Sequence, residues 1–476
     1  MKVLFASAEA APFFKTGGLG DVAYALPKEL VKQGVDVRVV LPYYTQTPAK
    51  YKEQIQDVCH FRFQLGVKNV YCGIKTLTLD GVVYYFIDNL SYFDRSTLYG
   101  QWDDGERFAY FSTAIIEMLE VIDWIPDVLH CNDWHTAMVP VLLVDRYHWK
   151  ERLRSIRKVL TIHNLRFQGV YDASILGNVF GTGYNTFTDD GVKYYDKVNF
   201  LKGGINFSDR VTTVSPTYAR EITTNAFGEN LEGVLGYNHW KLSGIINGID
   251  YELNNPESDP LIPFHFSADD LSGKAANKQA LQERLGLPVR SDVAMIGMVS
   301  RLTDQKGFQL VEERLEELLQ ADVQVVLLGT GEPQFEHSFR YFESRYPDKM
   351  RSLITFDLGL AQQIYASCDL FLMPSAFEPC GLSQLMSMCY GTLPIVHETG
   401  GLVDTVEPYN QYTGDGTGFS FHQFDSWTML QTIYYALDVY YNRPDDFARL
   451  VQQAMRRDFS WFEPTKAYIN LYQSLL

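Results

Sequence analysis

The chain has 476 residues, more than one hydrophobic core usually holds, so its length predicts two or three domains. A hydrophobic share of 46% and a charged share of 21% are typical of a soluble globular protein. Lys and Arg number 41 against 58 Asp and Glu, and the resulting net charge of -17 argues against nucleic acid or an anionic membrane as a partner.

The cysteines and the N-terminus indicate the compartment. The six cysteines contain no C-x-x-C pair and no regular spacing, which is typical of free thiols in a reducing environment. The first residues, M-K-V-L-F-A-S-A, hold one Lys and an apolar run too short for a signal peptide. No stretch approaches the roughly 18 apolar residues that a membrane helix needs. We therefore expect a cytoplasmic protein.

Residues 3–6 form the first predicted strand, followed by the loop A-P-F-F-K-T-G-G-L-G-D-V and an amphipathic helical pattern. A strand, a glycine loop and a helix in this order are typical of phosphate binding. Gly17 and Gly18 permit close approach of the backbone, and Lys15 adds a positive charge. The loop is not the dinucleotide fingerprint, because Ala23 stands where that motif requires glycine.

Several later strands of the first half end in polar loops. We expect these strands at residues 35–41, 82–87, 128–130, 159–163 and 210–215. Asp133 and His135 follow one of them and His163 ends another, so these side chains are predicted to converge on one edge of the sheet. Asp133 and His135 fit the organisation of a loop as well as contact with a substrate. Residues 178–203 indicate an insertion or a helix pair.

The second half repeats this plan. Residues 294–299 form a buried strand, the loop S-R-L-T-D-Q-K-G follows, and residues 310–319 form a helix. Arg301 and Lys306 beside Gly307 favour a phosphate site. Further strands are expected at residues 323–328 and 353–356. Because strand and helix alternate throughout, the sequence predicts an α/β protein with parallel, doubly wound sheets.

The stretch P-S-A-F-E-P-C-G-L-S-Q-L, which begins at Pro374, follows an apolar strand-like run over residues 369–373. It therefore lies at the carboxyl end of a strand, where open α/β sheets bind ligands. Glu378 has no neighbouring base in this stretch, and Gly381 allows close approach to a ligand. An acid beside anion-binding amides suits a sugar that leaves a phosphate. A solvated Glu that caps a helix explains the local pattern equally well.

Seven motifs together resemble one family, the bacterial glycogen synthases and plant starch synthases. They are K-T-G-G-L-G-D-V at 15–22, D-W-H at 133–135, H-N-L at 163–165, T-V-S-P-T-Y-A-R-E-I at 213–222, N-G-I-D at 247–250, S-R-L-x-x-Q-K-G at 300–307 and F-E-P-C-G-L at 377–382. The resemblance covers nearly the whole chain. It implies the GT-B fold, in which two doubly wound, Rossmann-like domains face each other across a cleft.

The resemblance also implies the domain limits. We expect an acceptor-side domain over residues 1–245, a nucleotide-sugar-binding domain over residues 246–457, and a C-terminal helix over residues 458–476 that returns to the first domain.

The activity that the resemblance implies is transfer of glucose from ADP-glucose to the non-reducing 4-hydroxyl of an α-1,4-glucan such as glycogen. The anomeric configuration is kept, ADP is released, and neither a metal nor another cofactor takes part. The residues agree with this, because the chain has no D-x-D pair and no His or Cys set with metal-ligand spacing. Lys15, Arg301 and Lys306 supply three cations that can neutralise a diphosphate.

Residue roles follow from the resemblance motif by motif. Arg301 and Lys306 match the pair that binds the diphosphate, Glu378 matches the catalytic carboxylate, and His163 and Asn247 match residues that hold the donor glucose. The remaining substrate-binding candidates are Lys15, Gly17, Gly18, Asp21, Asp133, His135, Phe356 against the adenine, Cys380, Gly381, Leu382 and Ser383. Asp21 is also favourable in the first turn of a helix whatever its function, and Cys380 also fits a packing role.

The mechanism stays open between two routes. Retaining hydrolases usually carry two carboxylates about 5 Å apart, one of them a nucleophile. The sequence supplies no obvious partner for Glu378, which favours same-face attack assisted by the leaving phosphate over a covalent glucosyl–Glu378 intermediate. The chain departs from the family at Ala376, where Arg is common, at Leu358, where an acidic residue often stands, and at Asn254, which replaces Trp.

Three other functions remain compatible with the sequence. A relative that binds α-glucan without catalysis would keep the fold, but the intact Lys15, Arg301, Lys306 and Glu378 argue against it. A related transferase that uses UDP-glucose differs only in the nucleotide. A glucan phosphorylase shares the fold type but needs a lysine-linked pyridoxal phosphate.

Overall fold

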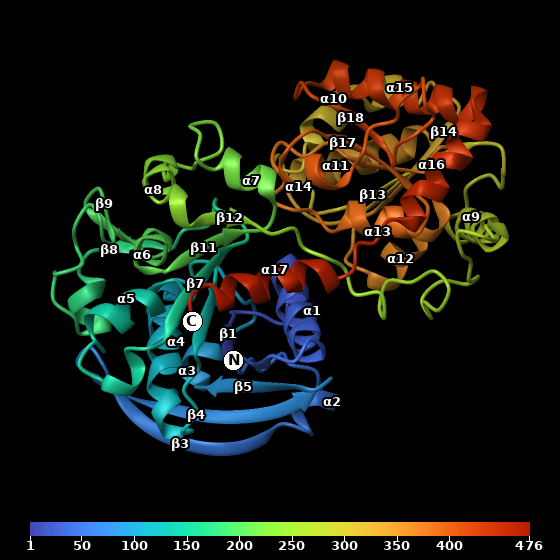
Figure 1. Ribbon diagram of the computed structural model, residues 1–476. Coiled ribbons are helices and arrows are strands. Elements are labelled where there is room, and N and C mark those ends of the chain that lie inside the picture. The colour runs from blue at the N-terminus through green and yellow to red at the C-terminus, as the bar shows by residue number, and fades with distance from the viewer. The chain divides into compact units, whose positions relative to one another are not determined.

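The computed structural model describes all 476 residues (Figure 1), and the chain forms two compact units. Unit 1 comprises Met1–Asn247 together with Trp461–Leu476, and unit 2 comprises Gly248–Ser460. Each unit is built around a β-sheet with helices on its faces. None of the helices combines the length and the apolar character that crossing a bilayer requires.

Unit 1 contains a nine-stranded sheet in the order β12-β11-β7-β6-β1-β2-β5-β4-β3. Its strands are β1 Lys2–Ala6, β2 Asp36–Pro42, β3 Gln56–Leu65, β4 Lys68–Leu79, β5 Val82–Asp88, β6 Val128–Asn132, β7 Arg157–Ile162, β11 Arg210–Thr213 and β12 Leu242–Gly244. Val3 pairs in parallel with Val37 of β2 and with Val128 of β6. The chain thus extends to one side of β1 and later to the other, which places a topological switch point between β1 and β6.

The sheet edge β3-β4-β5 is antiparallel and differs from the parallel pattern predicted for the whole sheet. Only Asp80 and Gly81 join β4 to β5, and both have positive φ, 51° and 80°. Two such residues form a hairpin turn, whereas a parallel connection needs a dozen residues or more. The Asp-Gly pair is the local signal that would have predicted this hairpin.

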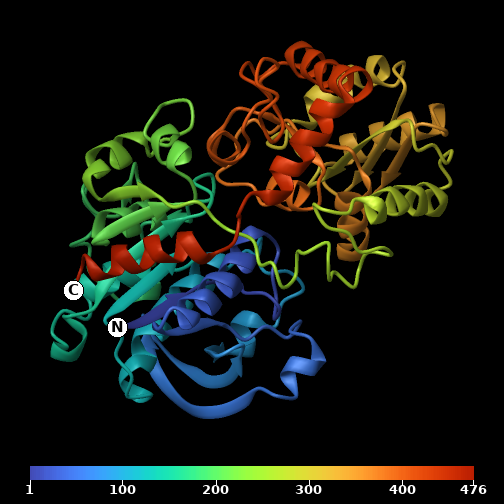
Figure 2. The same cartoon turned by 45° about the vertical axis from the view of Figure 1, so that its right-hand side comes forward.

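Helices cover both faces of the unit 1 sheet. They are α1 Gly18–Lys32, α2 Ala49–Lys52, α3 Leu90–Phe93, α4 Asp104–Val121, α5 Met138–Asp145, α6 Phe200–Phe207, α7 Pro216–Glu221, α8 Glu232–Tyr237 and α17 Phe462–Gln473, with short 3-10 turns at Glu151–Leu153 and His239–Lys241. The C-terminal helix α17 lies beside α1 (Figure 2), and Tyr468 and Tyr472 are fully buried in the same core cluster as Val3 and Leu26. The hydroxyl of Tyr472 lies 2.6 Å from Nδ1 of His130 on β6.

The insertion predicted for residues 178–203 holds no helix pair. Two of its segments, β9 Lys193–Tyr194 and β10 Lys197–Asn199, form a small antiparallel sheet with β8 Val170–Asp172, which precedes the predicted range. A five-residue π-helix, Leu176–Phe180, precedes this sheet's second strand. Strands of two and three residues are too short to give a readable alternation in the sequence.

Unit 2 contains a six-stranded parallel sheet in the order β15-β14-β13-β16-β17-β18. Its strands are β13 Ala294–Val299, β14 Val323–Leu328, β15 Met350–Leu353, β16 Leu370–Met373, β17 Leu393–His397 and β18 Phe419–Phe421. Ala294 pairs with Val323 and Ile296 pairs with Leu370, so the switch point lies between β13 and β16. The strand predicted at residues 353–356 lies three residues earlier, and that segment is instead a loop.

The helices of unit 2 pack on both faces of this sheet around two core clusters, a large one and a smaller one that includes Leu281 and Leu360. They are α9 Ser272–Leu285, α10 Phe308–Leu318, α11 Pro333–Arg345, α12 Leu358–Ser367, α13 Ser383–Cys389, α14 Gly400–Thr405, α15 Ser426–Asn442 and α16 Pro444–Arg456.

Candidate active site

Two loops meet at the switch point of unit 2. The loop after β13 ends at Gly307, which has a φ of 78° and whose added Cβ would lie 1.9 Å from the carbonyl oxygen of Pro374. Any other residue would push the two loops apart. The backbone N–H of Ala376 donates to the carbonyl of Gln305 at 2.8 Å. The loop that carries Arg301 and Lys306 is therefore tied to the turn that carries Glu378.

Lys306 and Glu378 form an ion pair at this junction. The Lys306 ammonium lies 2.8 Å and 3.0 Å from the two oxygens of Glu378. The hydroxyl of Ser375 donates to Oε2 of the same carboxylate at 2.8 Å. Glu378 is only 5% exposed, so it is not the solvated helix cap that the local sequence allowed. Lys306 has one further N–H bond that can face a diphosphate.

A third loop holds the backbone of Glu378 from the other side. The added Cβ of Gly400, which has a φ of 48°, would lie 1.8 Å from the carbonyl oxygen of Glu378. The N–H of Gly401 donates to that same oxygen at 3.1 Å. Glycines at these positions let the loop after β17 pack directly on the Glu378 turn, which fixes the carboxylate in place.

The other predicted residues of unit 2 occupy the same edge of the sheet. Arg301 is exposed and its guanidinium makes no ion pair. Phe356 is 78% exposed on the loop after β15, two strands away from β13. Cys380 is buried, as a packing residue would be, and Gly381, Leu382 and Ser383 lead into α13. The structure thus pairs Lys306 with Glu378, places Arg301 on the same loop as Lys306, and leaves Phe356 on a loop two strands away.

In unit 1, the glycine loop is held by the buried carboxylate of Glu9, which was not predicted from the sequence. Glu9 accepts hydrogen bonds from the Thr16 N–H at 2.7 Å, the Thr16 hydroxyl at 2.9 Å and the Gly20 N–H at 3.2 Å. Burial raises the pKa of Glu9 above its usual range. The position of Glu9 could have predicted this role, because it is an acidic residue three positions after the buried strand β1.

Lys15 and Asp21 pair above this loop, with 2.6 Å between Nζ and Oδ1. Both side chains are partly exposed, so Lys15 can exchange Asp21 for a ligand. Gly17 is exposed and serves as the N-cap of α1, and Gly18 is the first residue of that helix. Asp21 stands in the first turn, where a negative charge is favourable.

Asp133 and Asn132 hold His163 at the ends of β6 and β7. Oδ1 of Asp133 accepts the backbone N–H of His163 at 2.7 Å, and Oδ1 of Asn132 lies 2.8 Å from its Nε2. Because an amide oxygen only accepts, the proton is on Nε2 and Nδ1 is left as an acceptor. Burial lowers the pKa of His163 to about 3 and raises the pKa of Asp133 to about 7. The imidazole is therefore neutral and points its lone pair away from Asn132.

His135, unlike His163, is enclosed by aromatic rings. Its ring centroid lies 4.5 Å from that of Tyr99, on which it stacks, and 4.2 Å from that of Trp134, which is tilted against it. Phe108 meets it edge-on at 4.8 Å. Burial lowers its pKa to about 3. This environment favours the structural role that the sequence left open for His135. Tyr99, which forms one wall of this cluster, was not identified from the sequence.

Asn247 is buried three residues after the end of β12, and its Oδ1 has no hydrogen-bond partner. A buried acceptor without a donor is costly, on the order of 1–3 kcal/mol. A ligand hydroxyl at this position would supply the missing donor.

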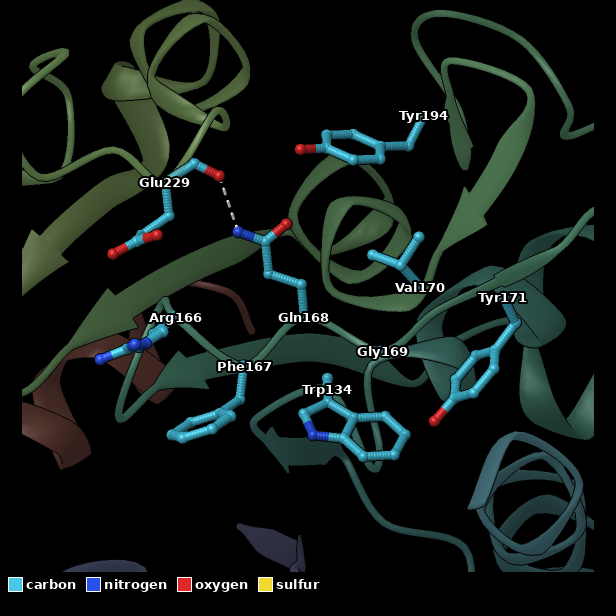
Figure 3. A pocket seen from close by; sticks show the side chains of 9 residues that line it. All are labelled: Trp134, Arg166, Phe167, Gln168, Gly169, Val170, Tyr171, Tyr194 and Glu229. Carbon is cyan, nitrogen blue, oxygen red and sulfur yellow. Dashed lines mark hydrogen bonds between the residues drawn. The ribbon is translucent and has the colours of Figure 1, made fainter. Parts of the chain in front are cut away.

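A pocket of about 430 Å³ opens on the loop that follows His163 (Figure 3). Its lining residues are Trp134, Arg166, Phe167, Gln168, Gly169, Val170, Tyr171, Tyr194 and Glu229. Aromatic rings and two charged side chains share this wall, and the amide of Gln168 donates to the carbonyl of Glu229 at 2.9 Å. The pocket could not be predicted from the sequence, because its lining residues come from four separate segments.

The structure gathers no group of three or more His, Cys, Asp or Glu side chains that could hold a metal ion.

Two family models match the chain. Residues 2–237 match a starch synthase catalytic domain, and residues 282–449 match the glycosyl transferases of group 1. These segments contain the sites of unit 1 and unit 2, respectively, with Asn247 lying between them.

Curated relatives match the whole chain. A glycogen synthase of Streptococcus equi subsp. zooepidemicus is 57% identical over 476 residues, and 100% of both chains is covered. A glycogen synthase of Streptococcus gordonii has the same identity and coverage.

Among solved structures, the catalytic domain of starch synthase IV from Arabidopsis thaliana, bound to ADP and acarbose, superposes with a TM-score of 0.93. It is 36% identical, and the match covers 100% of this chain and 99% of that one. Its agreement with both units identifies their fold as GT-B. The chain belongs to the family of glycogen and starch synthases.

Proposed function

We propose that the protein transfers glucose from ADP-glucose to the 4-hydroxyl at the non-reducing end of an α-1,4-glucan, with retention of configuration and release of ADP. The observation that carries this proposal is the Lys306–Glu378 pair at the switch point of unit 2, on the same loop as the exposed Arg301. The relatives support the substrates, because they are named glycogen synthases and the Arabidopsis enzyme was solved with ADP.

Arg301 and Lys306 bind the diphosphate in this proposal. Arg301 presents a guanidinium with no competing partner, and Lys306 offers the N–H bond that Glu378 leaves free. Both cations stabilise the charge that develops on the diphosphate as the glycosidic bond breaks. Such preorganised charges commonly contribute a factor of about 10²–10³ in rate. The exposed ring of Phe356 serves as a stacking surface for the adenine.

The donor glucose is held by two side-chain atoms that can each accept a hydrogen bond. Nδ1 of His163 is an unprotonated acceptor, and Oδ1 of Asn247 is a buried acceptor without a donor. Both therefore suit hydroxyl groups of glucose. Lys15 with the Gly17–Gly18 backbone is a second place where phosphate oxygens can be neutralised, once Lys15 leaves Asp21.

The acceptor glucan binds in the pocket after His163. Trp134, Phe167, Tyr171 and Tyr194 give rings on which the apolar faces of sugars can stack, while Arg166 and Glu229 offer hydrogen bonds to hydroxyl groups. The pocket and His163 share one loop. A chain end in the pocket therefore lies beside the group assigned to the donor sugar.

The reaction proceeds by same-face attack. The bond between C1 of glucose and the phosphate oxygen breaks, and the electron pair stays on the diphosphate. The acceptor hydroxyl bonds to C1 from the face that the diphosphate leaves, and its proton passes to a diphosphate oxygen. Both oxygens of Glu378 are engaged by Lys306 and Ser375, which favours an electrostatic and positioning role over a nucleophilic one.

The test is transfer of labelled glucose to glycogen, measured with ADP-glucose and with UDP-glucose in the absence of added metal. We expect transfer from ADP-glucose by the wild-type protein and a loss of at least about 100-fold in Glu378→Ala and Glu378→Gln. Glu313→Gln, on the exposed face of α10, is the matched control and should keep full activity. No transfer from either donor, or equal transfer by Glu378→Gln, would overturn the proposal.

A further inference from the structure

The imidazole of His397 is buried against the turn that carries Glu378. His397 is the last residue of β17 and is 6% exposed. Its ring packs between Phe421 and Phe424, at centroid distances of 5.5 Å and 5.1 Å. The backbone is anchored as well, because its carbonyl accepts the N–H of Thr399 at 2.9 Å. The ring therefore has one fixed place and orientation.

Both ring nitrogens of His397 face carbonyl oxygens. Nδ1 lies 2.6 Å from the carbonyl oxygen of Ser375, and Nε2 lies 3.2 Å from that of His422. Burial lowers the pKa of His397 although both carbonyl contacts act in the opposite direction. At neutral pH the ring thus carries a single N–H, and the shorter contact identifies Nδ1 as the donor.

Ser375 connects this contact to the candidate catalytic carboxylate. Its carbonyl accepts from His397, and its hydroxyl donates to Oε2 of Glu378 at 2.8 Å. Ser375 is 1% exposed, so no solvent can replace either bond. The path from the imidazole to the carboxylate therefore contains one residue and two hydrogen bonds.

We infer that His397 is a positioning residue for glucosyl transfer, which donates from Nδ1 to the Ser375 carbonyl and so holds the Ser375 hydroxyl against Glu378. The inference rests on the proposed function, because a positioning role has meaning only if Glu378 takes part in the reaction. His397 makes no direct contact with Glu378 and reaches it only through Ser375. Without the imidazole, the Ser375 carbonyl loses its donor. Ser375 can then shift locally and draw its hydroxyl away from Glu378, although the backbone of Ala376 and of Glu378 stays anchored. Displacements of about 1 Å can cost 100-fold in rate.

Three substitutions of His397 distinguish the contribution of Nδ1 from that of Nε2. The amide nitrogen of Asn reaches the place of Nδ1, whereas that of the longer Gln reaches the place of Nε2, and Leu provides neither donor. We expect His397→Asn to keep most of the wild-type kcat. His397→Gln and His397→Leu should lower kcat by about 10- to 100-fold while KM for ADP-glucose changes less than threefold. His337→Gln, at an exposed position on α11, is the control.

Thermal unfolding of the same variants distinguishes positioning from general loss of structure. Asn and Gln both leave the ring cavity between Phe421 and Phe424 unfilled, so their Tm values should be similar while their kcat values differ. A kcat that follows Tm across the three variants, or equal kcat for Asn and Gln, would overturn the inference.

A double variant tests the path through Ser375. Ser375→Ala removes the hydroxyl that reaches Glu378, so adding His397→Leu to it should cost little more than the worse single change. Additive losses would show that His397 acts elsewhere. If the wild-type protein transfers no glucose, the proposed function fails. If it transfers glucose and the Gln variant matches the Asn variant, only the positioning role fails.

Discussion

The ammonium of Lys306 lies within hydrogen-bond distance of both oxygens of Glu378, at 2.8 Å and 3.0 Å, although the two residues are 72 positions apart in the chain. Lys306→Met would leave the buried carboxylate without its cation. We expect this variant to lose glucosyl transfer by at least about 100-fold and to lose about 3–5 kcal/mol in the free energy of unfolding. Urea unfolding and the transfer assay measure the two effects separately.

The second substitution Glu378→Gln removes the uncompensated charge. The double variant Lys306→Met with Glu378→Gln should therefore recover much of the stability and none of the activity. Recovery of activity would contradict the assignment of Glu378. A Lys306→Met variant as stable as the wild-type protein would show that water reaches the pair.

Asp133 should give the unfolding free energy a distinct pH dependence. Burial raises its folded pKa to about 7, above the unfolded value of about 3.9, so the folded state keeps the proton between these two values. The stability that this group contributes is full below about pH 4 and is lost progressively as the pH rises from there through the folded pKa of about 7.

Asp133→Asn keeps an oxygen for the His163 N–H but cannot ionise. The stability of this variant relative to the wild-type protein should therefore increase between pH 4 and pH 7, by up to about 4 kcal/mol. Urea unfolding at several pH values measures it, with the exposed Asp348→Asn as the control. A constant difference over this range would mean that Asp133 is ionised throughout.

If the acceptor glucan binds in the pocket after His163, a change in the pocket lining should alter KM for the glucan but not KM for ADP-glucose. Phe167 lines the pocket with half of its surface exposed, so Phe167→Ala removes a stacking ring without opening the core. KM for the glucan should rise about 3- to 10-fold, while KM for ADP-glucose stays unchanged. Steady-state kinetics with glycogen check this, and Trp149→Ala, an exposed ring outside the pocket, should leave both constants unchanged.

The hydrogen bond between Tyr472 and His130 predicts how strongly α17 is held. Tyr472→Phe keeps the ring but removes the hydroxyl, which leaves Nδ1 of the fully buried His130 without a partner. The free energy of unfolding should fall by about 1–3 kcal/mol in urea denaturation. Ser474→Ala, at the exposed end of the chain, is the matched control and should have no measurable effect.

The central strands could be predicted because they are buried on both faces. Residues 294–299 form an apolar run and residues 323–328 an apolar run broken only by Gln324, and the structure confirms both as β13 and β14. The antiparallel edge was missed because β3 is half exposed and its polar residues interrupt the apolar pattern. The Asp80–Gly81 turn was a usable signal there.

The loops of the candidate site could also be predicted, because each motif is contiguous and follows a recognisable strand. The contacts between these loops could not be predicted. Lys306 was assigned to a diphosphate, and nothing local to it indicates that Glu378 is its partner in the folded chain. Glu9, Ser375 and His397 were missed for the same reason, since each acts on a segment distant in sequence or through a backbone group. The roles assigned to the site residues stay predictions.

The chain leaves unit 1 after Asn247 and returns to it at Trp461, and this order matters while the protein is being synthesised. Unit 2 is continuous, and its two ends already lie side by side, since the N–H of Ile249 donates to the carbonyl of Phe459 at 2.8 Å. It can fold on the ribosome as soon as it has emerged. Unit 1 is made first but finished last, because its core lacks the buried rings of Tyr468 and Tyr472 until the final residues are released.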